Sequence, residues 1–116
     1  MQPIFDTHIM LNVILLIADT EAIEDTNYLR LGNELLSRGI PVQCCFMDSL
    51  AMLDSEIVAD GFSLSEPLKL DAPFPARTSV SIGSADIVWI LTLGMRHSFL
   101  DKIQLLNCLP PGCRLI

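Results

Sequence analysis

The sequence predicts an α/β domain built around a mainly parallel β-sheet. Two continuous apolar runs rich in branched residues, at 12–18 and 86–93, are typical of strands buried on both faces of such a sheet. A further strand at 41–47 follows the first after a segment with helical spacing, so one β-α-β unit is recognisable. The length of 116 residues, 51% of them hydrophobic, suits one domain that folds without a disulfide or a metal.

The first elements follow an irregular lead-in at residues 1–11, which lacks the basic segment of a signal peptide. After the first strand comes an acidic loop at 19–25, and then a helix predicted over 26–38. Its apolar residues fall on one face: Tyr28, Leu31, Leu35 and Leu36. Gly39 suits the end of this helix, where a left-handed residue is usually required.

The middle of the chain predicts a small antiparallel hairpin. Asp60-Gly61 lies between two short apolar segments, 56–59 and 62–65, and both residues of this pair accept positive φ. The segment 66–79 has three prolines and no periodicity, which predicts a surface loop.

The last elements are a strand, a helix and a short strand. The buried run 86–93 leads into a loop at 94–97, and Ser98 is a candidate N-cap with Asp101 three residues later. The buried face of the helix comprises Phe99, Ile103 and Leu106. Residues 113–116 begin another strand. The chain ends inside this apolar strand, whereas chain termini are usually polar. We therefore expect the chain to be the first part of a longer protein, and the alternative is a short edge strand at the C-terminus.

The charge distribution excludes some functions. The net charge is −7, so the chain lacks the basic surface that nucleic-acid binding requires. The longest apolar runs are too short to span a membrane, and a reduced, cytoplasmic protein is expected. Residues 1–66 carry eleven acids and two bases, whereas residues 67–116 carry three acids and five bases. An anion site is therefore expected near one of the later cations: Arg77, Arg96, Lys102 or Arg114.

We expect the strands at 12–18 and 86–93 to lie side by side in parallel, so that their carboxyl ends form one cleft. Candidate binding residues follow these two strands, because ligands of open parallel sheets bind outside the carboxyl ends of the strands. Asp19 and Thr20 end the first strand and could hydrogen-bond a substrate, or could simply solvate the loop and cap the helix. After the second strand, Arg96 supplies a bidentate cation, and His97 a titratable donor or acceptor. Ser98 and the free N–H groups of the next helix point the same way. The alternative is that Arg96 neutralises acidic surface and His97 only caps the helix.

The cysteines predict no metal site. Cys44 and Cys45 are neighbours on a strand, so their side chains point to opposite faces and serve as small core hydrophobes. Cys108 and Cys113 flank a Pro-Pro-Gly turn, and whether they ever pair stays open. There is no C-x-x-C, glycine-rich dinucleotide motif or Walker lysine motif, and no catalytic residue is assigned.

Three stretches, taken in order, carry a family resemblance. The first runs from Leu35 through Arg38-Gly39 and Val42 to Asp48-Ser49-Leu50. The second is the segment 57–64 around Asp60-Gly61. The third is the strand from residue 86, followed by Gly94-Met95-Arg96-His97-Ser98-Phe99, a helix and Cys113-Arg114-Leu115-Ile116. In this order the stretches resemble the N-terminal domain of ATP-grasp ligases, above all ribosomal-protein glutamate ligases and bacterial glutathione synthetases.

The resemblance covers residues 12–116 and implies a three-layer, Rossmann-like pre-ATP-grasp domain. Such a domain packs on a C-terminal ATP-grasp domain of the same protein and shapes the substrate cleft. The parent ligase would use ATP and magnesium to activate a small carboxylate or peptide substrate and join it to an amine or a thiol. The isolated chain would hold no cofactor and would be inactive. By this reading Arg96, His97 and Ser98, with Asp19 or Thr20 opposite, contact substrate.

The chain departs from the family pattern at three places. Glutathione synthetases have Arg-Lys-Asp-Pro-Pro where this chain has only Arg96. Glutamate ligases usually have Arg where this chain has Thr92, and the family's first loop is often basic, whereas 19–25 is acidic. The alternative function is a free-standing α/β module for protein interaction or oligomerisation, such as a homodimer formed through an exposed sheet edge or apolar face.

Overall fold

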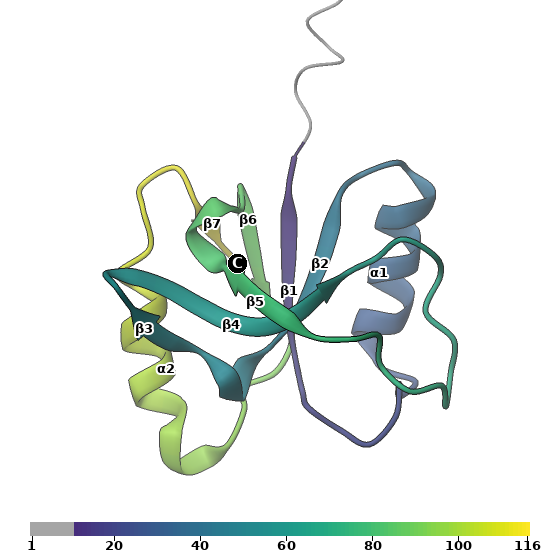
Figure 1. Cartoon of the computed structure of the whole chain (residues 1–116), viewed down its shortest axis with the longest axis horizontal. Helices are drawn as coiled ribbons and strands as arrows, with labels where there is room; N and C mark the ends of the chain where they lie inside the picture. Colours follow the sequence, from purple (N-terminus) through teal and green to yellow (C-terminus); the bar gives the residue numbers. More distant parts are fainter. Residues whose placement is uncertain (1–10) are drawn as a thin grey trace, which may run out of the picture.

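The computed structural model describes residues 11–116 and shows an α/β fold (Figure 1). A mixed, curled sheet of 7 strands has the order β3-β4-β2-β1-β6-β7, and β5 pairs with β4 outside this path. The lead-in predicted at residues 1–11 lies outside the described residues, apart from Leu11, which is exposed and belongs to no helix or strand.

The predicted β-α-β unit is present at the centre of the sheet. Strand β1 (Val13–Ile17) is buried along its whole length, as expected for a strand covered on both faces. It pairs in parallel with β2 (Val42–Phe46) on one side and with β6 (Ile87–Ile90) on the other. The short strand β7 (Arg114–Leu115) extends the sheet beyond β6, also in parallel. The two apolar runs therefore lie side by side, which confirms that prediction.

Two helices cover opposite faces of the sheet (Figure 1). Helix α1 (Asn27–Ser37) and helix α2 (Phe99–Leu106) lie close to their predicted positions. Gly39 ends the α1 segment with a φ of 74°, as predicted for a left-handed position. The predicted cap at Ser98 is only positional, because its side chain accepts no hydrogen bond from the helix.

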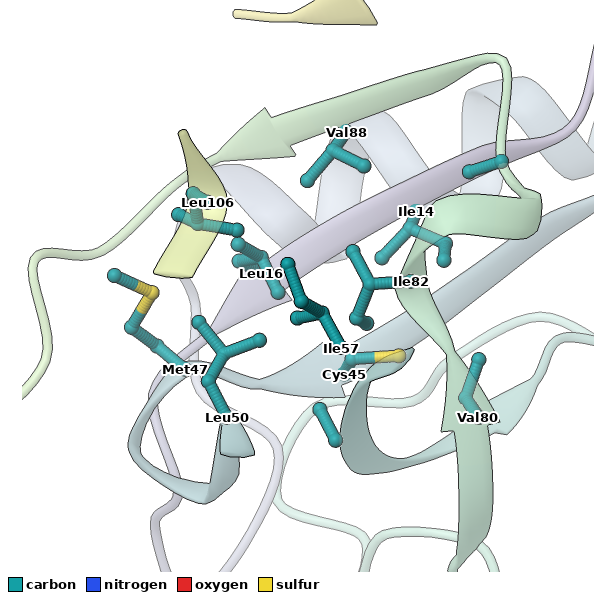
Figure 2. Close-up of a cluster of buried hydrophobic side chains, with 12 residues drawn as sticks. Ile14, Leu16, Cys45, Met47, Leu50, Ile57, Val80, Ile82, Val88 and Leu106 are labelled. Carbon is teal, nitrogen blue, oxygen red and sulfur yellow. The ribbon is translucent and has the colours of Figure 1, made fainter. Parts of the chain in front are cut away.

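The alternation of side chains along the central strands divides the core in two. Ile14, Leu16 and Cys45 point to the α2 side, whereas Leu15 and Cys44 point to the α1 side. Met47 and Leu106 lie at one end of the α2-side cluster, and Val80 lies towards the other (Figure 2). Cys44 and Cys45 are both fully buried, which confirms that they serve as core residues on opposite faces.

The predicted hairpin at Asp60-Gly61 is wrong. Both residues lie inside a single long strand, β4 (Glu56–Ser63). The hairpin turn lies earlier, at Asp54-Ser55, between β3 (Ala51–Leu53) and β4. Asp54 and Ser55 have φ values of 50° and 70°, so the turn has the positive φ angles predicted for it but uses other residues.

A close backbone approach explains the glycine at position 61. A Cβ atom there would lie 2.4 Å from the carbonyl oxygen of Cys44 and 2.7 Å from Sγ of Cys45. Only glycine lets β4 pair this closely with β2. The Asp-Gly pair therefore lies inside a strand, where Gly61 is required for close packing against β2. Its sequence resembles that of a hairpin turn.

The sequence does not predict strand β5 (Thr78–Ser81), and its first two residues fall within the segment 66–79 that was expected to be a loop, so the loop prediction is wrong at this end. It pairs with β4 along the edge opposite to β2 and β3, so that Gly61 lies between Cys45 and Thr78. As a result, three of the six strand pairings are antiparallel. The sheet is thus mixed, and not mainly parallel as expected.

Candidate functional site

The carboxyl ends of β1 and β6 open at the same edge of the sheet. Their parallel register sets Leu16 beside Ile90, and the N–H of Leu91 continues the pairing by donating to the carbonyl of Leu16 at 3.0 Å. The chain then turns towards α1 after β1, and towards α2 after β6. Neighbouring strands whose connections leave in opposite directions form the crevice where open α/β sheets bind ligands.

A hollow of about 150 Å³ occupies this crevice on the α1 side. The residues that line it come from the end of β1, the start of α1 and the segment after β6: Ile17, Ala18, Glu24, Thr26, Asn27, Tyr28, Leu91 and Thr92. Its polar groups are one carboxylate, two threonine hydroxyls, an amide and a phenol, and it has no fixed cation. It therefore suits a neutral polar or amine-bearing group better than a phosphate.

Tyr28 forms the buried wall of this hollow. Its hydroxyl accepts the N–H of Glu24 at 2.8 Å, which ties the acidic loop to the helix that follows it. Burial raises the pKa of the Tyr28 phenol above its ordinary value, so the phenol remains neutral at physiological pH. The wall is consequently a hydrogen-bonding surface without a charge.

Asp19 does not line the hollow, and its carboxylate is paired with Arg77. Its two oxygens accept hydrogen bonds from Nη1 and Nη2 of Arg77, at 2.8 and 2.7 Å. The Arg77 guanidinium also lies 3.8 Å from the centre of the Phe46 ring, at the end of β2. Hydrogen bonding to Arg77 holds the pKa of Asp19 below its ordinary value. Asp19 therefore stays ionised and paired with Arg77. The sequence predicts Arg77 only as one of four cations near which an anion could bind.

Thr20 is also engaged within its own loop. Its hydroxyl donates to the carbonyl of Ala22 at 2.7 Å, which is the loop-solvation alternative left open for this residue. Two further hydrogen bonds, at 2.8 Å each, join Ile23 to the proline-rich segment at 66–79. The N–H of Ile23 donates to the carbonyl of Ala72, and the carbonyl of Ile23 accepts the N–H of Asp71. The loop at 19–25 is therefore held between α1 and the proline-rich segment.

Arg96, His97 and Ser98 form a single 3-10 turn, η4 (Arg96–Ser98), that leads directly into α2. Arg96 and His97 are exposed, and Ser98 is half-buried. Within residues 11–116, neither Arg96 nor His97 forms a hydrogen bond or ion pair with Asp19 or Thr20, and neither lines the hollow. The two predicted halves of the site share an edge of the sheet, but they lie on different sides of it.

A larger hollow, of about 320 Å³, lies away from this edge, between the β3–β4 hairpin, β5 and the C-terminal end of α2. Met52, Ile57 and Leu109 supply its apolar lining, and Glu56 its charge. None of the predicted site residues lines it. The Glu56 carboxylate is engaged, because it accepts a hydrogen bond from Ser81 at 2.8 Å.

In the part of the chain that the structure describes, no group of three or more His, Cys, Asp or Glu side chains is placed to hold a metal ion. All four cysteines are free, and burial raises the pKa of both Cys44 and Cys45 to about 12. No helix between residues 11 and 116 is both long enough and apolar enough to cross a membrane.

No family model matches the chain, and no curated protein matches it.

Proposed function

We propose that the chain is the N-terminal, substrate-cleft domain of an ATP-dependent carboxylate–amine or carboxylate–thiol ligase of the ATP-grasp group. The observation that carries this proposal is the parallel pairing of β1 with β6, whose carboxyl ends flank the 150 Å³ hollow. A cleft at that edge is where an open α/β sheet presents a substrate to a second domain. Within the observed α/β class, we propose that the chain has the three-layer, Rossmann-like pre-ATP-grasp fold.

The positions of the three stretches that resemble the family also support the proposal. The first spans the end of α1, the strand β2 and the turn η2 (Met47–Ser49) after it. The second falls on β4, and the third spans β6, η4 and α2. The first and third stretches thus reach the carboxyl edge of the sheet, where a substrate cleft is expected.

The proposal divides the chemistry between two parts of the protein. In the ligase reaction the γ-phosphoryl group of ATP passes to a substrate carboxylate, giving ADP and an acyl phosphate. An amine or thiol then attacks the acyl carbon, and inorganic phosphate leaves. The proposal assigns ATP and magnesium to a C-terminal ATP-grasp domain of the same protein. This chain contributes substrate contacts from Arg96, His97 and Ser98 and from the hollow.

Three measurements test this assignment. We expect the 116-residue chain to show no binding of magnesium-ATP by calorimetry, whereas a longer protein that includes it should hydrolyse ATP only when its carboxylate substrate is present. Hydroxylamine should trap the acyl phosphate as a hydroxamate. Tight binding of magnesium-ATP by the chain alone, or the absence of carboxylate-dependent ADP formation in the longer protein, contradicts the proposal.

A variant of the longer protein tests the substrate contact itself. Replacing Arg96 with Ala in the longer protein should raise the KM for the carboxylate substrate, because a bidentate cation is lost. Arg30→Ala is a suitable control, since Arg30 lies on α1 and forms an exposed ion pair with Asp25 of the acidic loop. Unchanged KM and kcat in the Arg96 variant would remove this residue from the site.

An interaction or oligomerisation module is the second candidate. Three large apolar side chains around η4 are exposed, Leu93 by 60%, Met95 by 52% and Leu100 by 72%, and such a group suits a protein partner. Under the first proposal the same side chains would face the rest of the ligase. Sedimentation of the longest native protein separates the two, because a stable dimer without any ATP-grasp domain favours the module.

A further inference from the structure

One hydrogen bond joins the segment after β2 to the segment after β6. The Asp48 carboxylate, in η2, accepts the backbone N–H of Met95 at 2.7 Å, across 47 residues of sequence. Met95 immediately precedes Arg96 and His97. The bond therefore fixes the backbone from which both candidate substrate contacts project.

The residue before Met95 is shaped by the same contact. Gly94 has a φ of 74°, which residues with a side chain rarely adopt. A Cβ atom on Gly94 would also lie 2.6 Å from Oδ1 of Asp48 and 3.0 Å from Cγ of Met47. Glycine at this position is thus required both by the backbone angle and by the approach of the carboxylate.

The segment that carries Asp48 is itself firmly held. Met47 and Leu50, on either side of it, are buried in the core, where Figure 2 shows them on the α2 side. Between them, Ser49 donates to the carbonyl of Phe46 at 2.7 Å and accepts the N–H of Asp60 at 2.8 Å. A carboxylate on so rigid a support is a fixed acceptor.

The helix after η4 is anchored to the same segment. Lys102, on α2, donates from Nζ to the carbonyl of Leu50 at 2.9 Å. Asp48 therefore holds the start of the η4 turn, and Leu50 holds the helix that follows it. Arg96 and His97 lie on the short stretch between these two anchors.

We propose that Asp48 is a positioning residue for the substrate-contact turn: its carboxylate holds Met95, and through it sets where Arg96 and His97 present their side chains to a carboxylate substrate. The substrate part of this inference rests on the proposed function. The ordering of the turn rests only on the hydrogen bond, the fit of Gly94 and the burial of the segment around Asp48.

Hydrogen exchange on the 116-residue chain tests the ordering part. The N–H of Ser98, which donates to the carbonyl of Met95 at 3.1 Å, reports closure of the turn. Asp48→Ala should speed its exchange by about 10-fold or more, as expected when a hydrogen bond to a charged acceptor is lost. Asp48→Asn keeps an acceptor oxygen and should restore exchange to nearly the wild-type rate.

Met95→Pro removes the donor instead of the acceptor, and its ring fits the Met95 φ of −75°. This variant should match Asp48→Ala, and the double variant should be no faster than either, because both remove the same bond. If Asp48→Ala does not fold, Met95→Pro still decides the question, because Ser98 exchange that equals the wild-type rate in this variant overturns the positioning role. Asp86→Ala is the matched control, since Asp86 accepts the N–H of Asn12 at 2.8 Å at the opposite end of the sheet.

The outcomes separate this inference from the proposed function. Equal Ser98 exchange in Asp48→Ala, Asp86→Ala and wild type overturns the positioning role. In the longer protein, Asp48→Ala should raise the substrate KM as Arg96→Ala does, with a smaller change in kcat, and Asp48→Asn should rescue it. If Ser98 exchange accelerates but KM is unchanged in both the Asp48 and Arg96 variants, the positioning of the turn stands and the proposed substrate site is wrong.

Discussion

Replacing Gly61 with Ala tests the close pairing of β4 with β2. The added Cβ would lie 2.4 Å from the Cys44 carbonyl oxygen, whereas an ordinary contact begins at 3.4 Å, so the strands must separate by about 1 Å. Cys44 and Cys45 are fully buried between the helices and cannot move aside freely. Overpacking of a core costs about 1–3 kcal/mol, and we expect the upper end because the clash is with strand backbone.

A loss of about 3 kcal/mol should lower the Tm by roughly 12 °C, because the entropy of unfolding is about 2.1 cal/mol/K per residue. Thermal unfolding followed by circular dichroism measures this shift. Gly112→Ala is the matched control, because a Cβ at Gly112 meets no atom within 4 Å and that residue has no positive φ. If the Gly61 and Gly112 variants unfold at the same temperature, the close approach of the two strands is refuted.

A second variant separates the observed strand from the turn that the sequence suggests. Asp60 is exposed within β4, so Asp60→Thr should change the free energy of unfolding by less than about 1 kcal/mol, because Thr favours strands. If Asp60-Gly61 formed a hairpin turn, the β-branched residue would be strained at positive φ and clearly destabilising. A large loss in Asp60→Thr would therefore argue against the long strand.

Three further predictions concern the turn between β3 and β4, the Asp19–Arg77 ion pair and the cysteines. Ser55→Gly should raise the free energy of unfolding by about 0.5–1 kcal/mol in urea titrations, because Ser55 has a φ of 70°; no gain would place the turn elsewhere. Asp19→Asn should cost about 0.2–1 kcal/mol at pH 7, as exposed ion pairs do. Because Arg77 lowers the Asp19 pKa, this difference should be full above about pH 4 and vanish as the pH falls through the lower folded pKa; a difference that does not shrink as the pH falls below about 4 would have another cause. A thiol reagent near pH 8 should modify exposed Cys108 in the native chain, and should reach Cys44 and Cys45, whose pKa values are about 12, only after unfolding; rapid labelling of either buried thiol would contradict the packing.

Local signals in the sequence located most of the helices and strands. Branched apolar runs identified β1 and β6, and helical spacing identified α1 and α2. These signals work because burial on one face or two imposes a periodicity that any short window contains. Strand β5 lacked such a signal, because Val80 is the only apolar residue among its four.

The candidate site was less accessible to sequence reasoning. The carboxyl ends of β1 and β6 were correctly placed at one edge, since parallel neighbours must end together. The partners of the polar residues were not predicted. Asp19 pairs with Arg77 across 58 residues, and Asp48 binds Met95 across 47. The two members of each pair lie in distant parts of the sequence, so only the folded chain brings them together.

The amino-acid sequence by itself determined the α/β class, the two central strands, the helices and the opposite orientations of Cys44 and Cys45. Each of these depends on a residue and its near neighbours, through periodicity and burial. Tertiary structure alone decided that Asp60-Gly61 lies inside a strand, that the sheet is half antiparallel, and which groups occupy Asp19 and Asp48. The reason is that a short strand's pairing and a hydrogen bond between distant residues depend on where the rest of the chain has packed.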